Sequence, residues 1–80
     1  MPTVTRFDGL RVVIYTDDHR PAHVHVIGRG CEAIFRLVGS ASPSELRENF
    51  GFSRTEIARI RRRLDTDMPI LTAAWESIHG

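Results

Sequence analysis

The chain has no lysine, a single cysteine and no long apolar run, and these absences bound its class. All eleven basic side chains among its 80 residues are arginine. One cysteine, Cys31, cannot form an internal disulfide. No apolar run approaches the roughly 20 residues that a membrane-spanning helix needs. The N-terminus lacks the charged start and apolar core of a signal peptide, so we expect a cytoplasmic protein that does not enter a membrane.

The exclusive use of arginine has two explanations. A GC-rich coding sequence favours arginine codons, and the pattern then carries no function. Arginine is also the side chain whose planar fork binds phosphate or carboxylate through two hydrogen bonds. The net charge of +1 does not separate these explanations. Clustering of the arginines in the fold would favour the second.

The first half of the chain predicts four β-strands joined by short connections. Asp8-Gly9 is a strong signal for a two-residue hairpin, and Gly28-Arg29-Gly30 marks a second turn. Short connections favour antiparallel pairing, because parallel strands need long crossovers. The predicted strands are Thr3–Phe7, Leu10–Thr16, Ala22–Ile27 and Cys31–Leu37.

The second half predicts two to three helices. A short helix is expected after an N-cap at Ser42, ending at Gly51. Ser53 and Glu56 have the spacing of a capping box for the next helix. A break over 65–69 separates that helix from the last one. The expected fold is a single α+β domain over residues 1–80: a four-stranded antiparallel meander within 3–37, followed by helices within 43–79 packed on one face.

Alternation along the predicted strands assigns side chains to two faces of the sheet. The apolar face, expected to pack against the helices, carries Leu10, Val12, Ile14, Val24, Val26, Cys31, Ala33, Phe35 and Leu37. The opposite face carries Arg11, Tyr15, His23, His25, Glu32 and Arg36, together with Val13 and Ile34. This second face is the candidate functional surface.

Three of the four histidines lie close together in the segment that leads into the third strand. His23 and His25 share one face of that strand because strand side chains alternate. Two imidazoles could share a metal ion if a third ligand converges, and His19, Glu32 and Asp18 are the candidates. Zinc suits imidazole and carboxylate ligands. One hypothesis is therefore a zinc site on His23, His25 and His19.

A second hypothesis uses the same face without a metal or other cofactor, as a metal-independent ribonuclease. His23 and His25 would serve as general base and acid, because histidine can take either role near neutral pH. Arg11 and Arg36 would bind the phosphate, and Tyr15 would stack on a base or donate a proton. In a third explanation, the histidines only bond to the preceding loop, or the face binds a partner protein.

The arginine-rich helix supports a further alternative, a DNA-binding regulator. The sequence from Leu46 to Ile60 partly imitates a helix-turn-helix. The arginine-rich helix would be its second helix, with Arg54, Arg59 and Arg62 directed toward a DNA groove. Charge runs of this kind usually mark a solvated helix face. Asp65 and Asp67, which follow at once, fit that simpler explanation.

The sequence contains Met1–Val4, Tyr15, Asp18–Val26, Glu32-Ala33 with Phe35, Gly51-Phe52-Ser53 and Trp75–Gly80. In this order, these segments together resemble a family of small bacterial proteins catalogued as domain of unknown function 4160 (DUF4160). Family members usually carry a second proline where this chain has Ala22. Their genes often neighbour a second small gene, so the resemblance implies a toxin-antitoxin-like module and a small protein partner encoded nearby. RNA and a second copy of the chain are further candidate partners.

Overall fold

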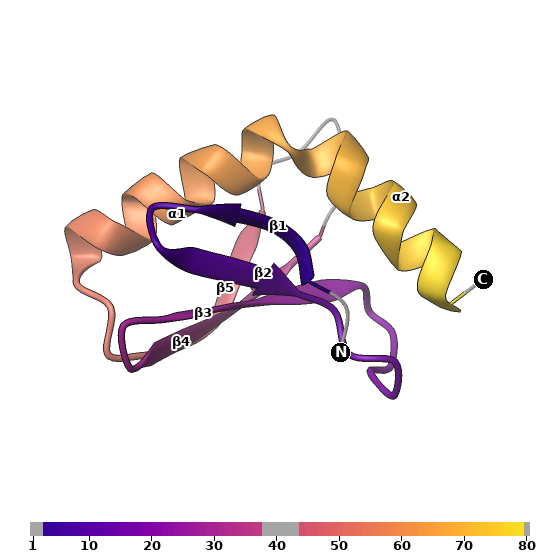
Figure 1. The fold of residues 1–80 in the computed structure, drawn as a ribbon, viewed down its shortest axis with the longest axis horizontal. Coiled ribbons are helices and arrows are strands. Elements are labelled where there is room, and N and C mark those ends of the chain that lie inside the picture. Colours follow the sequence, from indigo (N-terminus) through magenta and orange to yellow (C-terminus); the bar gives the residue numbers. More distant parts are fainter. Residues whose placement is uncertain (1–2, 38–43, 80) are drawn as a thin grey trace.

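Five antiparallel strands precede two helices in the computed structural model, which describes residues 3–37 and 44–79 (Figure 1). The strands form one sheet in the order β1-β2-β3-β4-β5, so each strand pairs with its neighbours in sequence. The predicted α+β class and antiparallel meander are confirmed, with one strand more than expected. The elements are β1 (Thr3–Phe7), β2 (Leu10–Val13), β3 (His23–Gly28), β4 (Cys31–Arg36), β5 (Glu45–Phe50), α1 (Arg54–Thr66) and α2 (Met68–His79).

Two tight turns set the register of the first four strands. Asp8 and Gly9 have φ values of 51° and 76°, and Arg29 and Gly30 repeat these values. Positive φ at both central residues is the requirement of a type I′ hairpin, whose twist matches that of the flanking strands. Both predicted hairpins are therefore confirmed.

The segment Glu45–Phe50 is a strand, and the predicted helix there is wrong. It pairs with β4 and places Leu46 opposite Phe35, so one apolar side chain reaches the core. The segment has only two large apolar residues, and Phe50 remains 58% exposed. As a strand it satisfies the backbone groups along the free edge of β4, which a helix would leave open. The expected cap at Ser42 lies outside the described residues.

Helix α1 begins as predicted, with a complete capping box. Ser53 Oγ accepts from the Glu56 backbone N–H, and the Glu56 carboxylate accepts from the Ser53 N–H. The backbone hydrogen bond from Ser53 is the main cause that lowers the pKa of Glu56. The predicted break is shorter than expected, because only Asp67 separates α1 from α2.

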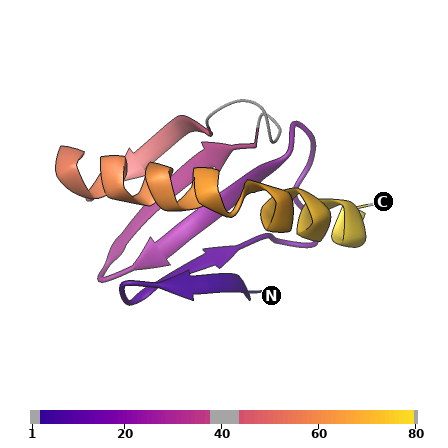
Figure 2. The same ribbon diagram turned by 90° about the horizontal axis from the view of Figure 1, so that it is seen from above.

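Both helices cover the same face of the sheet, as predicted, and no helix of the described residues lies on the other face (Figure 2). Trp75 of α2 is among the largest fully buried side chains. Cys31 is half-buried and packs against the core. The core cluster comprises Phe7, Leu10, Val12, Ile14, Val24, Val26, Ala33, Phe35, Leu37, Phe52, Ile60, Leu64, Met68, Leu71 and Trp75.

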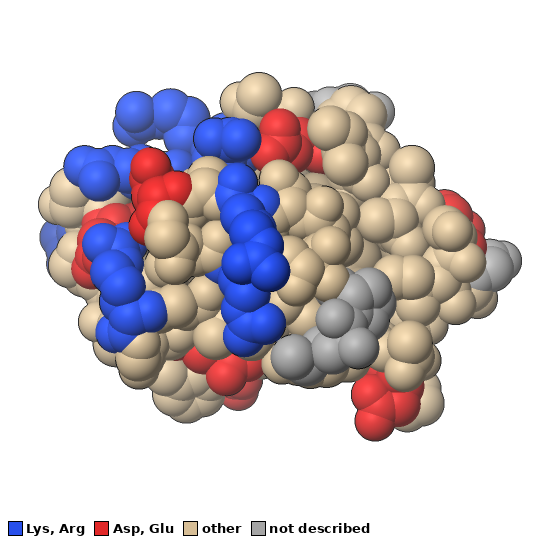
Figure 3. All heavy atoms as spheres, viewed as in Figure 1, with Lys and Arg blue, Asp and Glu red and all other residues tan. Residues whose placement is uncertain are grey.

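The outer surface is uneven in charge. Arginine side chains gather over α1 and the β1–β2 hairpin, on the left and centre of the molecule in Figure 3. In the part of the chain that the structure describes, neither helix has the length and apolar character needed to cross a membrane.

Candidate metal centre

Three side chains converge where β3 begins. Nε2 of His23 lies 3.5 Å from Oδ2 of Asp18, and Nε2 of His25 lies 3.3 Å from the same oxygen. The three ligand atoms all lie within 4.8 Å of one another. We call this group, Asp18, His23 and His25, the triad.

Strand geometry and a local turn position the triad. His23 and His25 are separated by one residue on β3, so their side chains leave the same face of the sheet. Asp18 follows the end of β2 and is held there by Tyr15. The Tyr15 backbone N–H donates to Asp18 Oδ2 at 3.1 Å, and the Asp18 N–H donates to the Tyr15 carbonyl at 3.1 Å.

The second nitrogen of each imidazole has a partner of its own. Nδ1 of His23 lies 2.9 Å from the Pro21 carbonyl oxygen, which only accepts hydrogen bonds. Nδ1 of His25 lies 3.1 Å from Oε2 of Glu32, and an ionised carboxylate also only accepts. These contacts assign the proton of each neutral imidazole to Nδ1. Both Nε2 atoms then present a lone pair toward Asp18.

With both imidazoles neutral, this arrangement brings three electron-rich atoms together, a set that a bound metal cation or a proton on Nε2 would balance. Nε2 of His25 is buried and has no hydrogen-bond partner among residues 3–37 and 44–79, because Asp18 Oδ2 is near but not aligned with it. Ligands that lie 2.0–2.1 Å from a tetrahedral zinc ion are separated from each other by roughly 3.3–3.4 Å. The two separations from Asp18, 3.3 and 3.5 Å, are close to that spacing, and the ligand atoms of the two histidines lie within 4.8 Å of each other.

Aromatic rings enclose the triad. The Tyr15 ring meets the His25 ring edge-on, with centroids 4.6 Å apart, and the Trp75 ring lies 5.4 Å from that of His23. The His79 ring lies against the same tryptophan in a tilted arrangement, with centroids 4.0 Å apart. Only 12% of the His25 side chain and 20% of the His23 side chain are exposed. The site is therefore largely shielded from water, which strengthens its electrostatic interactions.

Asp18, and not His19, completes the triad. His19 is exposed and lies outside the cluster. It instead lines a neighbouring cavity of about 330 Å³ together with His23, Ile34, Arg47 and others. The zinc hypothesis therefore keeps two of its three proposed ligands and exchanges the third. Asp18 was a candidate from its position, but the turn that directs it toward the histidines was not predictable from local residue preferences.

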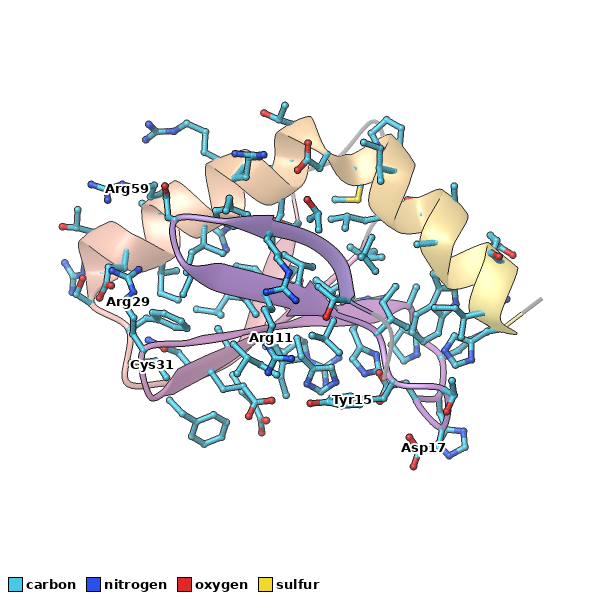
Figure 4. The ribbon with its side chains drawn as sticks, in the orientation of Figure 1. Arg11, Tyr15, Asp17, Arg29, Cys31 and Arg59 are labelled. Atoms are coloured by element: carbon cyan, nitrogen blue, oxygen red, sulfur yellow. The ribbon has the colours of Figure 1, made fainter. Side chains whose placement is uncertain are left out.

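The residues proposed for RNA cleavage share a face but are not all free to act. Arg11 and Tyr15 lie on the side of the sheet away from the helices (Figure 4). Arg36, opposite His23, is 3.6 Å from the Glu45 carboxylate. General acid–base catalysis needs imidazole nitrogens that face the substrate. Here both Nδ1 atoms lie against protein acceptors and both Nε2 atoms lie within 3.5 Å of Asp18 Oδ2. A substrate would have to displace one of these contacts before either imidazole could act on it.

The arginines proposed to contact DNA are brought together only in part. Arg59 and Arg62 line one shallow groove beside the β1–β2 hairpin. Arg54, the first residue of α1, is not among the residues that line it. All three side chains are exposed.

Comparison with known proteins identifies a family but no characterised relative. Residues 9–76 match the model of a family described as Domain of unknown function (DUF4160). No curated protein and no solved structure matches the chain. The match confirms the resemblance drawn from the sequence.

Proposed function

The chain belongs to the DUF4160 family, whose function is unknown. From the geometry of its site, we propose that it is a metal-binding domain that holds one zinc ion on Asp18, His23 and His25. The observation that carries the proposal is the convergence of both Nε2 atoms on one carboxylate oxygen, at 3.3 and 3.5 Å. Each Nδ1 is held by an acceptor, so each Nε2 is free to bind a cation.

The surroundings of the triad suit a transition metal. Metal-binding histidines almost always donate their other N–H to a carbonyl or carboxylate, which fixes the tautomer and the ring orientation. Pro21 and Glu32 occupy those two positions here. Imidazole with carboxylate is a ligand set that zinc accepts readily, whereas magnesium and calcium prefer oxygen alone.

Three protein ligands leave one tetrahedral position for water or a substrate, which is the pattern of catalytic rather than structural zinc sites. The cavity lined by His19, His23, Arg47 and Glu48 adjoins the triad through His23. A small anionic molecule in that cavity would have a cationic partner in Arg47. Zinc, when bound, would supply a Lewis acid at this position.

The proposal is tested by zinc binding to the purified, demetallated protein. We expect one zinc ion per chain by isothermal titration and by mass spectrometry of the loaded protein. The double variant His23→Ala, His25→Ala removes two ligands. It is expected to lose at least about 100-fold in affinity, since even the loss of an outer-shell partner costs about 10–100-fold.

His19→Ala is the matched control, because His19 lies in the same loop but outside the triad. It should bind zinc like the parent chain. Equal loss of zinc in His19→Ala and in the double variant would refute the assigned ligands, and absence of zinc from the parent chain would refute the site.

A second candidate function is supported by the uncovered face of the sheet. The protein acts there as one component of a toxin-antitoxin-like pair, binding a small protein encoded by a neighbouring gene. Phe50 is 58% exposed on β5, and Ile27 and Ile34 belong to the same face by register. Phe50, with the half-buried Ile27 and Ile34, gives this face an apolar surface that a partner protein would cover.

Co-expression with the product of the neighbouring gene tests this pairing. Phe50→Asp should prevent co-purification of the two proteins, because it places a charge in the proposed interface. Ile70→Asp is the matched control: Ile70 is 59% exposed, but it belongs to α2, in the helix layer. Growth of the host is recorded with each gene alone and with both. The pairing is rejected if the proteins neither co-purify nor alter each other's effect on growth.

A further inference from the structure

Two arginines stand directly opposite each other on the first hairpin. Arg6 of β1 pairs with Arg11 of β2. Like charges in directly opposite positions destabilise a sheet, unless something of opposite charge lies between or over them. Among the residues that the structure describes, neither side chain forms an ion pair. This pair is independent of the triad.

A groove on the other side of the same edge strand gathers three more arginines. It is lined by Phe7, Asp8, Arg59, Arg62, Arg63 and Thr66. Arg63 is already engaged, because its guanidinium lies 5.0 Å above the Phe7 ring and its Nε donates to Asp67 at 3.1 Å. Arg59 and Arg62 are exposed and make no ion pair within the described part of the chain.

The two groups form one basic stripe. Arg6 and Phe7 are consecutive residues of β1, so the pair and the groove meet at this edge strand. Figure 3 shows the arginine side chains running from the level of α1 down across the β1–β2 hairpin. We propose that this stripe, Arg6, Arg11, Arg59 and Arg62, binds the phosphate backbone of single-stranded nucleic acid.

The shape of the stripe selects a single strand over a duplex. The stripe begins on the helix layer, passes the edge of the sheet and ends on the outer face with Arg11 (Figure 4). A flexible strand can follow such a turn, whereas the phosphates of a duplex follow a rigid helical path. Arginine binds each phosphate through two parallel hydrogen bonds. Tyr15 lies on the same face as Arg11 and offers a ring on which a base can stack.

Fluorescence anisotropy with a labelled, unstructured 20-nucleotide RNA tests the stripe. Four phosphate contacts on a single strand predict that the logarithm of affinity falls with the logarithm of salt with a slope of about −3. Two double variants each remove two of the four arginines: one combines Arg6→Gln with Arg11→Gln, and the other combines Arg59→Gln with Arg62→Gln. Each should weaken RNA binding at least about 10-fold at low salt and reduce the salt slope to about −1.4. Binding is measured with and without a chelator, so that the result does not depend on zinc.

Two single substitutions sharpen the test. Arg61 precedes Arg62 by one residue and points about 100° away from it, on the flank of α1 opposite the groove. Arg61→Gln removes the same charge from the same helix and should leave affinity nearly unchanged. Asp8→Asn removes the acidic residue of the groove and should tighten binding, since asparagine tolerates the positive φ of 51° at this turn.

Three results would overturn the proposal. The first is a parent chain that does not bind the RNA at 50 mM salt. The second is a loss of RNA affinity in Arg61→Gln as large as the loss in the double variant that combines Arg59→Gln with Arg62→Gln. Binding would then depend on total charge alone. The third is tighter binding to a 20-base-pair DNA duplex than to the single strand. Circular dichroism of each variant verifies that the fold is retained.

Discussion

Trp75→Ala is expected to lower the free energy of unfolding by about 3–5 kcal/mol, the usual range for truncating a buried Trp. Trp75 is 1% exposed and is among the largest fully buried side chains of the core. A domain of this length has a total stability of about 4–12 kcal/mol, so the substitution removes a large part of it. Urea unfolding followed by circular dichroism measures the loss.

Trp75→Phe is the companion variant, which is expected to stay folded so that its stability and zinc binding can both be measured. Phenylalanine retains an apolar ring, and no hydrogen bond is lost, because Nε1 of Trp75 has no partner among the described residues. We expect a clearly smaller loss of stability than for Trp75→Ala. Because the Trp75 ring lies 5.4 Å from that of His23, Trp75→Phe should also weaken zinc binding modestly. If Trp75→Ala has the same free energy of unfolding as the parent chain, the placement of Trp75 in the core is wrong.

Asp18→Asn is expected to lower zinc affinity by more than about 100-fold, because it removes the only charged ligand of the triad. The amide oxygen can still accept from the Tyr15 N–H, so the turn is expected to survive. Zinc at 100 times its Kd should stabilise the parent chain by about 2.7 kcal/mol. The same zinc concentration should add almost nothing to Asp18→Asn.

Asp17→Asn supplies the matched control for this substitution. Asp17 is the neighbouring residue and carries the same charge, but it is exposed and lies outside the triad. Its zinc-dependent rise in thermal unfolding temperature should equal that of the parent chain. If Asp17→Asn and Asp18→Asn both lose that rise, the net negative charge of the loop, and not a specific ligand, accounts for zinc binding.

The strands and turns that depend on local chemistry were predictable from the sequence. The positive-φ turn at Asp8-Gly9 and the capping box of Ser53 and Glu56 depend on residues close in the chain. The strand β5 was not predictable, because Glu45–Phe50 has weak local preference and is fixed by pairing with β4. A proline and a Ser-x-x-Glu-like pattern near its start imitated a helix cap. Tertiary pairing overrode that local signal.

The part of the site that depends on the alternation of side chains along a strand was predictable from the sequence. The shared face of His23 and His25 followed from their spacing on one strand. The choice between Asp18 and His19 did not, since it depends on the turn that Tyr15 closes. The contact of Trp75 with His23 also lay beyond sequence reasoning. Alternation and helical periodicity assign residues to faces, but they do not say where the end of α2 meets the start of β3.

X-ray absorption spectroscopy at the zinc edge, on the protein loaded with one equivalent of zinc, tests the central claim most directly. The account predicts a first shell of nitrogen and oxygen at about 2.0–2.1 Å, with the outer-shell scattering of two imidazoles. Substituting His23 and His25 together should abolish the imidazole signal. A sulfur neighbour at about 2.3 Å would place the metal on Cys31 instead, and a shell of oxygen alone would leave the histidines without a metal; either result would contradict the account.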